Sequence, residues 1–252
     1  MKHKIMTFNL RWECRTDGIN VFFNRQDRVL KAIADESPDI IGFQEATDVI
    51  RQFLRNGLLQ DYVVLGCGRK EGFKGEGICI AYKRDMFELI AYDTFWLSDT
   101  PDVPGSIYEN IDQSSCPRTT VAVRLRRIED GEPLWFFNTH LDHKGEQARV
   151  KGIKQIASEI ARRGGKFVLT GDMNARPDTK CIATALAIDG IVDATAGLGG
   201  TFHDFGRRPE PSKIDYIFTN GSPLGAYVVP DTPTEDGIYI SDHYPVCAHI
   251  DI

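Results

Sequence analysis

The sequence lacks several features that would place the protein in a special class. None of its apolar segments is long enough to cross a bilayer, and its N-terminal residues lack the apolar stretch of a secretory signal. We therefore expect no membrane association and a cytoplasmic location, or secretion if a leader preceded this sequence. Internal repeats, low-complexity tracts and linkers are also absent, so residues 1–252 are expected to form a single domain.

Cysteine pairs and an excess of basic residues are absent as well. Six cysteines are dispersed without a C-x-x-C motif, which predicts reduced, mostly buried thiols rather than disulfides or a zinc site. The 30 Lys and Arg residues are outnumbered by 36 Asp and Glu residues, and the net charge is −6. This balance argues against tight, non-specific binding to duplex nucleic acid, although a local basic groove stays open.

Apolar and alternating runs predict about ten strands with a few helices between them. A strand at 3–10, a helix with Asn24 as its N-cap and a buried strand at 39–45 form a βαβ-like opening. Residues 129–132 predict a hairpin turn. Residues 99–117 are the longest irregular segment, and loops of this length often carry function. Three further helices are expected, at roughly 47–59, 146–163 and 179–188.

Polar side chains of one chemical kind recur where the predicted strands begin or end. Active sites are commonly built on such loops at the edge of a sheet. Oxygen ligands suit a hard cation such as Mg²⁺ or Mn²⁺, whereas zinc would call for more closely spaced His or Cys. Each of these residues taken alone is equally consistent with a solvated turn. The set comprises Asn9, Gln44, Glu45, Asn138, His140, Asp142, His143, Asp172, Asn174, Asp215, Asp242 and His243.

Six segments, TFNLR, GFQE, NTHLD, GDMNA, KIDYIF and SDHYPV, follow one another between residues 5 and 250. In this order they resemble the motif series of the endonuclease/exonuclease/phosphatase superfamily, which includes deoxyribonuclease-I-like nucleases, abasic-site endonucleases, poly(A) deadenylases, bacterial sphingomyelinases and inositol-polyphosphate 5-phosphatases. The segment FWLSDTPDVPGS further resembles uncharacterised bacterial members. The resemblance implies an α/β fold, a four-layer α/β sandwich of two packed, mainly antiparallel β-sheets flanked by helices, with the site at one rim.

The resemblance also implies metal ligands and substrate contacts. Glu45 resembles the main metal carboxylate, Asn9 is expected close to the metal and the phosphate, and Asp242 resembles a second acid on the metal side. Substrate contacts are implied for Arg118, which opens a strand after the long loop. Glu76 matches the position that orients the first histidine of the site.

Catalytic roles follow from the same resemblance. Asp172 and Asn174 look like the pair that orients the attacking water and holds a phosphate oxygen. His140 is similar to the histidine that hydrogen-bonds the scissile phosphate, and Asp215 and His243 resemble the carboxylate–imidazole pair. An imidazole near its ordinary pKa takes the proton of water at neutral pH, while a buried carboxylate fixes its tautomer.

We therefore expect a metal-dependent phosphoesterase that hydrolyses a phosphodiester or a phosphomonoester by attack of an activated water. The phosphorylated substrate is either a small molecule or a single-stranded nucleic acid, cleaved in the manner of an exonuclease or deadenylase. A catalytically silent binding protein on the same scaffold is the alternative from a different class. The complete set of acid, amide and histidine residues argues against it, and the oligomeric state is left open.

Several residues outside the motifs have two competing interpretations. Trp96, Tyr108 and Phe202 either stack a base or sugar at the rim or pack in the core. The adjacent Arg207 and Arg208 lie in a predicted loop, where they are either solvated or placed to meet an acidic substrate. His143 is not assigned to the site.

Overall fold

The apolar runs form twelve strands, which assemble into two six-stranded sheets in the computed structural model of residues 1–252. Only the pairs β1–β2 and β7–β8 are parallel, so both sheets are mainly antiparallel, as expected. The first sheet has the order β11 (Ser222–Val228), β12 (Val246–Asp251), β1 (Lys2–Asn9), β2 (Ile40–Ala46), β4 (Gly77–Lys83), β3 (Tyr62–Gly68). The second has the order β5 (Phe87–Trp96), β6 (Thr119–Arg127), β7 (Pro133–His140), β8 (Phe167–Asp172), β10 (Asp215–Thr219), β9 (Val192–Asp193).

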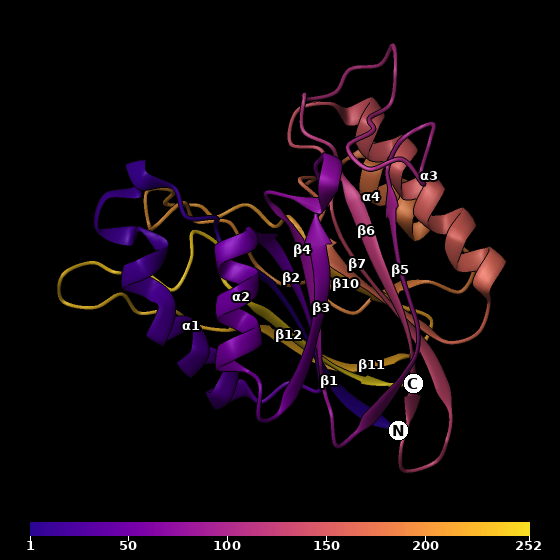
Figure 1. The fold of residues 1–252 in the computed structure, drawn as a ribbon, viewed down its shortest axis with the longest axis horizontal. Coiled ribbons are helices and arrows are strands. Elements are labelled where there is room, and N and C mark those ends of the chain that lie inside the picture. The colour runs from indigo at the N-terminus through magenta and orange to yellow at the C-terminus, as the bar shows by residue number, and fades with distance from the viewer.

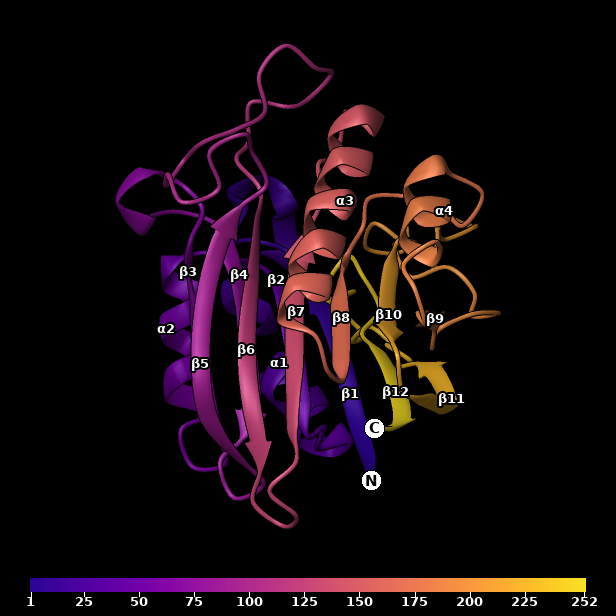
Figure 2. The ribbon, with the colours of Figure 1, turned by 90° about the vertical axis from the view of Figure 1, so that its right-hand side faces the viewer.

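Helices cover the outer face of each sheet, which gives the four layers predicted from the motif series (Figure 1). The first sheet carries α1 (Phe22–Glu36) and α2 (Asp48–Gly57). The second carries α3 (Glu146–Arg163) and α4 (Lys180–Leu186), which stand side by side over β7, β8 and β10 (Figure 2). Two short 3-10 helices, η1 (Arg15–Asn20) and η2 (Glu71–Phe73), lie in connections.

The start of α1 differs from the prediction. The helix begins at Phe22, so Asn24 lies inside its first turn, and its amide donates a hydrogen bond to the Ile19 carbonyl oxygen at 2.9 Å instead of capping the helix. Phe22 is buried and packs edge-on against Phe53 of α2, with ring centroids 5.3 Å apart. This tertiary contact favours an earlier helix start than the capping signal indicated.

Period-two alternation along the strands divides the apolar residues among three cores. Ile5 of β1 points into the core between the sheets, and its neighbour Met6 points toward α1 and α2. In the second sheet, Val168 of β8 points inward and Leu169 points toward α3 and α4. Both sheets are therefore buried on both faces, which explains why their central strands are almost continuously apolar. All six cysteines are free and none forms a disulfide.

A buried polar network joins the two sheets. The Asn138 amide nitrogen donates to the carbonyl oxygens of Phe43 and Cys79, and its Oδ1 accepts hydrogen bonds from Gln44 and Thr170. All of these groups are buried and satisfied, so their cost of desolvation is offset. Gln44 and Asn138 therefore hold the sheets together, and their inclusion among the polar residues of the rim was wrong.

The long loop 99–117 is anchored at its C-terminal end. The backbone amide of Ser114 donates to both carboxylate oxygens of Asp142 at 3.2 Å, and the Ser114 hydroxyl donates to the same carboxylate. Trp96 and Tyr108 are buried, so these two aromatic residues pack in the interior rather than at the rim. None of the helices in the structure is both long and apolar enough to cross a membrane.

Candidate active site

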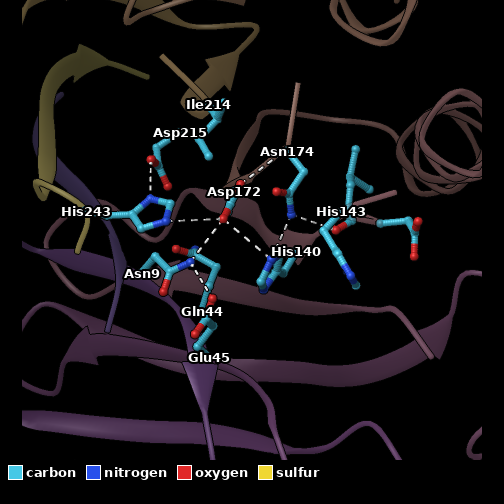
Figure 3. Close-up of polar contacts among 12 residues, drawn as sticks. Asn9, Gln44, Glu45, His140, His143, Asp172, Asn174, Ile214, Asp215 and His243 are labelled. Atoms are coloured by element: carbon cyan, nitrogen blue, oxygen red, sulfur yellow. Dashed lines mark hydrogen bonds and ion pairs between the residues drawn. The ribbon is translucent and has the colours of Figure 1, made fainter. Parts of the chain in front are cut away.

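One edge of the sandwich receives functional side chains from both sheets. β1 runs parallel to β2, and β7 runs parallel to β8. The carboxyl ends of all four strands meet at this edge, where they present Asn9, Glu45, His140 and Asp172 (Figure 3). β10 is antiparallel to β8, which places its first residue, Asp215, directly opposite Asp172. The last strand begins only at Val246, so Asp242 and His243 lie in the loop ahead of it rather than at its opening.

Asp215 and His243 form a buried pair. The imidazole Nδ1 lies 2.8 Å from Asp215 Oδ2, and the Thr201 hydroxyl donates to the same oxygen at 2.5 Å. Burial by itself would lower the pKa of His243, but the charge and hydrogen bond of Asp215, together with Asp172 and Asp242, outweigh it and raise the pKa to about 10. Asp215 thus fixes the ring and directs its Nε2 toward Asp172, at 3.8 Å.

Asp172 occupies the centre of the cluster. Its Oδ2 accepts a hydrogen bond from the Asn9 amide at 3.0 Å, and its Oδ1 accepts one from the backbone N–H of Asn174 at 2.8 Å. Burial and the nearby Asp215 carboxylate raise the pKa of Asp172 to about 7. The carboxyl group therefore gains a proton at unusually high pH unless positive charge is close.

His140 and Asn174 lie on the other side of Asp172 (Figure 3). The Asn174 amide nitrogen is 3.0 Å from His140 Nε2, which is itself 3.4 Å from Asp172 Oδ2. Burial, reinforced by the positive charges of Arg118 and Arg69, holds the pKa of His140 well below its usual value, so this ring is neutral at pH 7. Asn174 has a φ of 47°, a left-handed conformation that Asn tolerates better than most residues.

A β-bulge presents Glu45 to the cluster. The register between β2 and β4 shifts between Phe43 and Ala46, and Glu45 has a φ of 59°. Bulges re-aim a side chain at the end of a strand, and here the carboxylate turns to the rim. Its Oε1 accepts a hydrogen bond from the Asn9 amide at 3.1 Å, and its Oε2 accepts one from the backbone N–H of Trp12 at 3.0 Å.

The predicted metal-side residues lie together, but not all of them present free oxygens. Asn9 directs its amide nitrogen between Glu45 and Asp172, while its Oδ1 accepts a hydrogen bond from the backbone N–H of Arg11. Asp242 lies 3.7 Å from the Arg11 guanidinium, and burial raises the pKa of Asp242 to about 6. A direct metal contact by Asn9 would require its amide to rotate.

The donor set fits a divalent cation. Ligand atoms of Asp172, Asp215 and His243 lie within 4.8 Å of one another, but Asp215 and His243 are bonded to each other, so the carboxylate that would hold the cation is Glu45, which adjoins Asp172 through Asn9. Burial raises the pKa of both Asp172 and Asp242, and the nearby carboxylates of Asp215 and Glu45 add to this effect, so a bound cation would stabilise the charged forms. Oxygen-rich sets of this kind suit Mg²⁺ or Mn²⁺ better than softer metals.

The predicted substrate contacts border His140. Arg118 is buried, and its Nη2 lies 2.8 Å from Nδ1 of His143, the histidine that the sequence did not assign to the site. Its Nε and Nη1 form no hydrogen bond, although Nε lies 3.9 Å from the Asp142 carboxylate. Glu76 forms a double ion pair with Arg69, at 2.7 and 2.8 Å, and lies 4.0 Å from His140 Nδ1.

Sequence reasoning missed Arg69, His143 and Thr201. Arg69 follows β3 and Glu76 precedes β4, and the last residue of β3, Gly68, pairs with the first residue of β4, Gly77. A predicted β3–β4 hairpin would therefore have placed Arg69 next to Glu76. The adjacency of His143 to the NTHLD motif was a weaker signal. Nothing local marks Thr201, which reaches Asp215 across a long connection.

The chain belongs to the Endonuclease/Exonuclease/phosphatase family, whose model matches residues 6–243. A solved endonuclease/exonuclease/phosphatase from Bacteroides vulgatus is 31% identical, with a TM-score of 0.91, and the match covers 100% of this chain and 99% of that one. The mannosyl-6-phosphatase of Bacteroides thetaiotaomicron is 26% identical, with a TM-score of 0.88 and coverage of 99% and 100%. Uncharacterized protein L388 of Acanthamoeba polyphaga mimivirus is 26% identical in an alignment of 246 positions, and the match covers 88% of this chain and 90% of the relative.

These comparisons confirm the resemblance drawn from the motif series, uncharacterised bacterial members included, and the fold it implied. Members of the family are hydrolases that act on phosphoester bonds, generally with a divalent metal.

Proposed function

We propose that this protein is a divalent-metal-dependent phosphoesterase that hydrolyses a phosphomonoester of a small molecule, with phosphorylated sugars as the leading class. The observation that carries the proposal is the buried Asp215–His243 pair, whose ring faces the central Asp172 carboxylate. The similarity to a mannosyl-6-phosphatase over the full length of both chains supports a monoester of a sugar. The acidic net charge of −6 also favours a small substrate over a nucleic-acid duplex.

Each residue then has a defined task in hydrolysis. His140 and Asn174 donate hydrogen bonds to phosphoryl oxygens, and Asp172 orients the attacking water. His243 takes the proton of that water as the new oxygen–phosphorus bond forms, and Asp215 stabilises the resulting imidazolium. The ester oxygen leaves with the organic group and is protonated from solvent. When bound near Glu45, a divalent cation spreads the charge that develops on the phosphoryl oxygens.

The charge state of His243 sets a condition on this scheme. The expectation of an ordinary pKa was wrong for the cluster by itself, because Asp215, Asp172 and Asp242 raise the pKa of His243 to about 10. The ring therefore holds its proton at neutral pH until the negative charge around it is offset. Positive charge bound near the cluster would lower the pKa of His243 toward the range in which the ring acts as a general base.

A nuclease acting on single strands is the second candidate. The observation that favours it is Phe202, which is only partly buried and lies with its ring centroid 4.8 Å from that of His243. An aromatic ring beside the reacting phosphate is able to stack a nucleobase regardless of its identity. The same ring also packs against the apolar face of a sugar, so Phe202 alone does not choose between the two substrates.

A substrate panel tests these proposals. The wild-type protein is assayed with p-nitrophenyl phosphate, bis-p-nitrophenyl phosphate, mannose 6-phosphate and single-stranded RNA and DNA, each with Mg²⁺, Mn²⁺ or EDTA. We expect metal-dependent release of phosphate from the monoesters. Faster cleavage of the diester and the nucleic acids would favour the nuclease, and binding without turnover on any substrate would identify a silent binding protein.

A further inference from the structure

The connection between β9 and β10 builds a turn beside the active site. The backbone N–H of Phe202 donates to Ser212 O at 2.9 Å, and the N–H of Ser212 donates to Phe202 O at 3.1 Å. This closed pair of hydrogen bonds fixes the base of the turn, and Phe202 also bridges to His243. The backbone N–H of Arg208 donates to the His203 carbonyl oxygen at 3.1 Å, inside the turn. The turn is therefore held at both its base and its interior.

Phe202 connects this turn to the catalytic pair. Its ring lies 4.8 Å from the His243 ring, and the Arg208 guanidinium lies 4.5 Å from the centroid of the Phe202 ring. A planar guanidinium held by an aromatic ring keeps its N–H groups available at the edge of the plane. The Phe202 ring therefore contacts both the Arg208 guanidinium and His243, which we assign as the general base.

Arg208 and its neighbour Arg207 differ in how their charges are used. Arg207 is paired with Asp204 and donates to its carboxylate at 2.6 Å. Arg208 is exposed and forms no ion pair or side-chain hydrogen bond, and its guanidinium lies over the Phe202 ring. The centre beside it holds the carboxylates of Asp172, Asp215 and Asp242. An unpaired cation at the rim of such an acidic centre offsets its repulsion of an anionic substrate.

We propose that Arg208, held over Phe202, binds a second anionic group of the substrate while the scissile phosphate lies at Asp172. The natural substrate would then be a phosphomonoester with a further phosphate or carboxylate. This inference rests on the proposed function, because it assumes that the scissile phosphate binds at Asp172. The guanidinium fork matches both anions, since each offers two oxygens in one plane to two N–H groups.

Three sugar phosphates that differ in their second group test the proposal. Fructose 6-phosphate has none, fructose 1,6-bisphosphate has a second phosphate, and 6-phosphogluconate has a carboxylate. Initial rates in competition with p-nitrophenyl phosphate give the affinity of each probe, whether it acts as an inhibitor or as an alternative substrate. We expect the wild-type protein to prefer at least one of the doubly anionic probes over fructose 6-phosphate by about tenfold, the effect of one charge-assisted contact.

Variants of the two arginines decide the outcome. Arg208→Gln should abolish the preference, Arg208→Lys should retain part of it, and the matched control Arg207→Gln should retain it in full. Thermal unfolding of each variant checks that the fold is intact. No preference in the wild-type protein, or a preference that survives Arg208→Gln, would overturn the assignment.

The failure of the proposed function can be recognised separately. If p-nitrophenyl phosphate is not hydrolysed with either metal, the phosphatase proposal fails. Calorimetric titration of the same three probes into the wild-type, Arg208→Gln and Arg207→Gln proteins then tests the anion site without turnover. Equal affinities of the three proteins for the doubly anionic probes would refute the site.

Discussion

Substitution of Asp215 and His243, singly and together, tests the central pair most directly. The two side chains are joined at 2.8 Å and are both buried, so solvent cannot replace either partner. The Thr201 hydroxyl and His243 Nδ1 both contact Oδ2 of Asp215, so Asp215→Asn replaces the carboxylate toward both of them by a neutral amide. The amide carries no charge with which to stabilise the imidazolium that forms when His243 takes the proton of water.

The expected losses follow from this geometry. A positioned general base contributes roughly 10²- to 10⁴-fold to the rate, so His243→Ala should reduce kcat by at least about 100-fold at saturating Mg²⁺. Asp215→Asn should also reduce kcat strongly, because a neutral amide does not stabilise the imidazolium that His243 becomes. Once the imidazole is gone, Asp215 has nothing to orient, and the double variant should lose little more than His243→Ala alone.

The assay is steady-state release of p-nitrophenol from p-nitrophenyl phosphate by the wild-type protein and the three variants, with circular dichroism to confirm folding. The conservative variant Thr201→Ser keeps the hydroxyl that donates to Asp215 and accepts its backbone N–H, and it serves as a control that leaves the pair in place. If the double variant raises the activation free energy by the sum of the increases in the two single variants, the two residues act independently. The mechanism proposed for this site would then be wrong.

Three further predictions concern the metal, the long loop and the contact between the sheets. Glu45→Gln should raise the Mg²⁺ concentration required for half-maximal activity and lower kcat; unchanged activity at low Mg²⁺ would exclude Glu45 as a ligand. Exchange of residues 100–107 for a short linker, which keeps the buried Tyr108, should change relative rates on the substrate panel more than the rate on p-nitrophenyl phosphate, whereas equal losses would indicate a structural role. Gly42→Ala should reduce the free energy of unfolding in urea by about 1–3 kcal/mol, because a Cβ there would lie 2.1 Å from Thr170 Oγ1; an unchanged value would show that the sheets adjust.

Local sequence patterns are enough to identify most of the helices and strands and most of the residues that meet at the rim. Apolar periodicity is a local signal, and it located the helix at Glu146–Arg163 and the hairpin before Pro133. The ordered motifs supplied Asn9, Glu45 and Asp172 because each stands at a strand end. These features depend on a few neighbouring residues, so they can be recognised without knowledge of the fold.

Which polar side chains lie close together in space depends on how the two sheets pack. Alternation places Gln44 and Asn138 on one face of their strands, but it does not reveal that this face meets the other sheet. The same limit applies to Phe202 and Arg208, whose positions beside His243 depend on pairing between distant segments. Hydrogen bonds and charges act over a few ångströms of space, and only the packing of the two sheets brings these distant residues within that range.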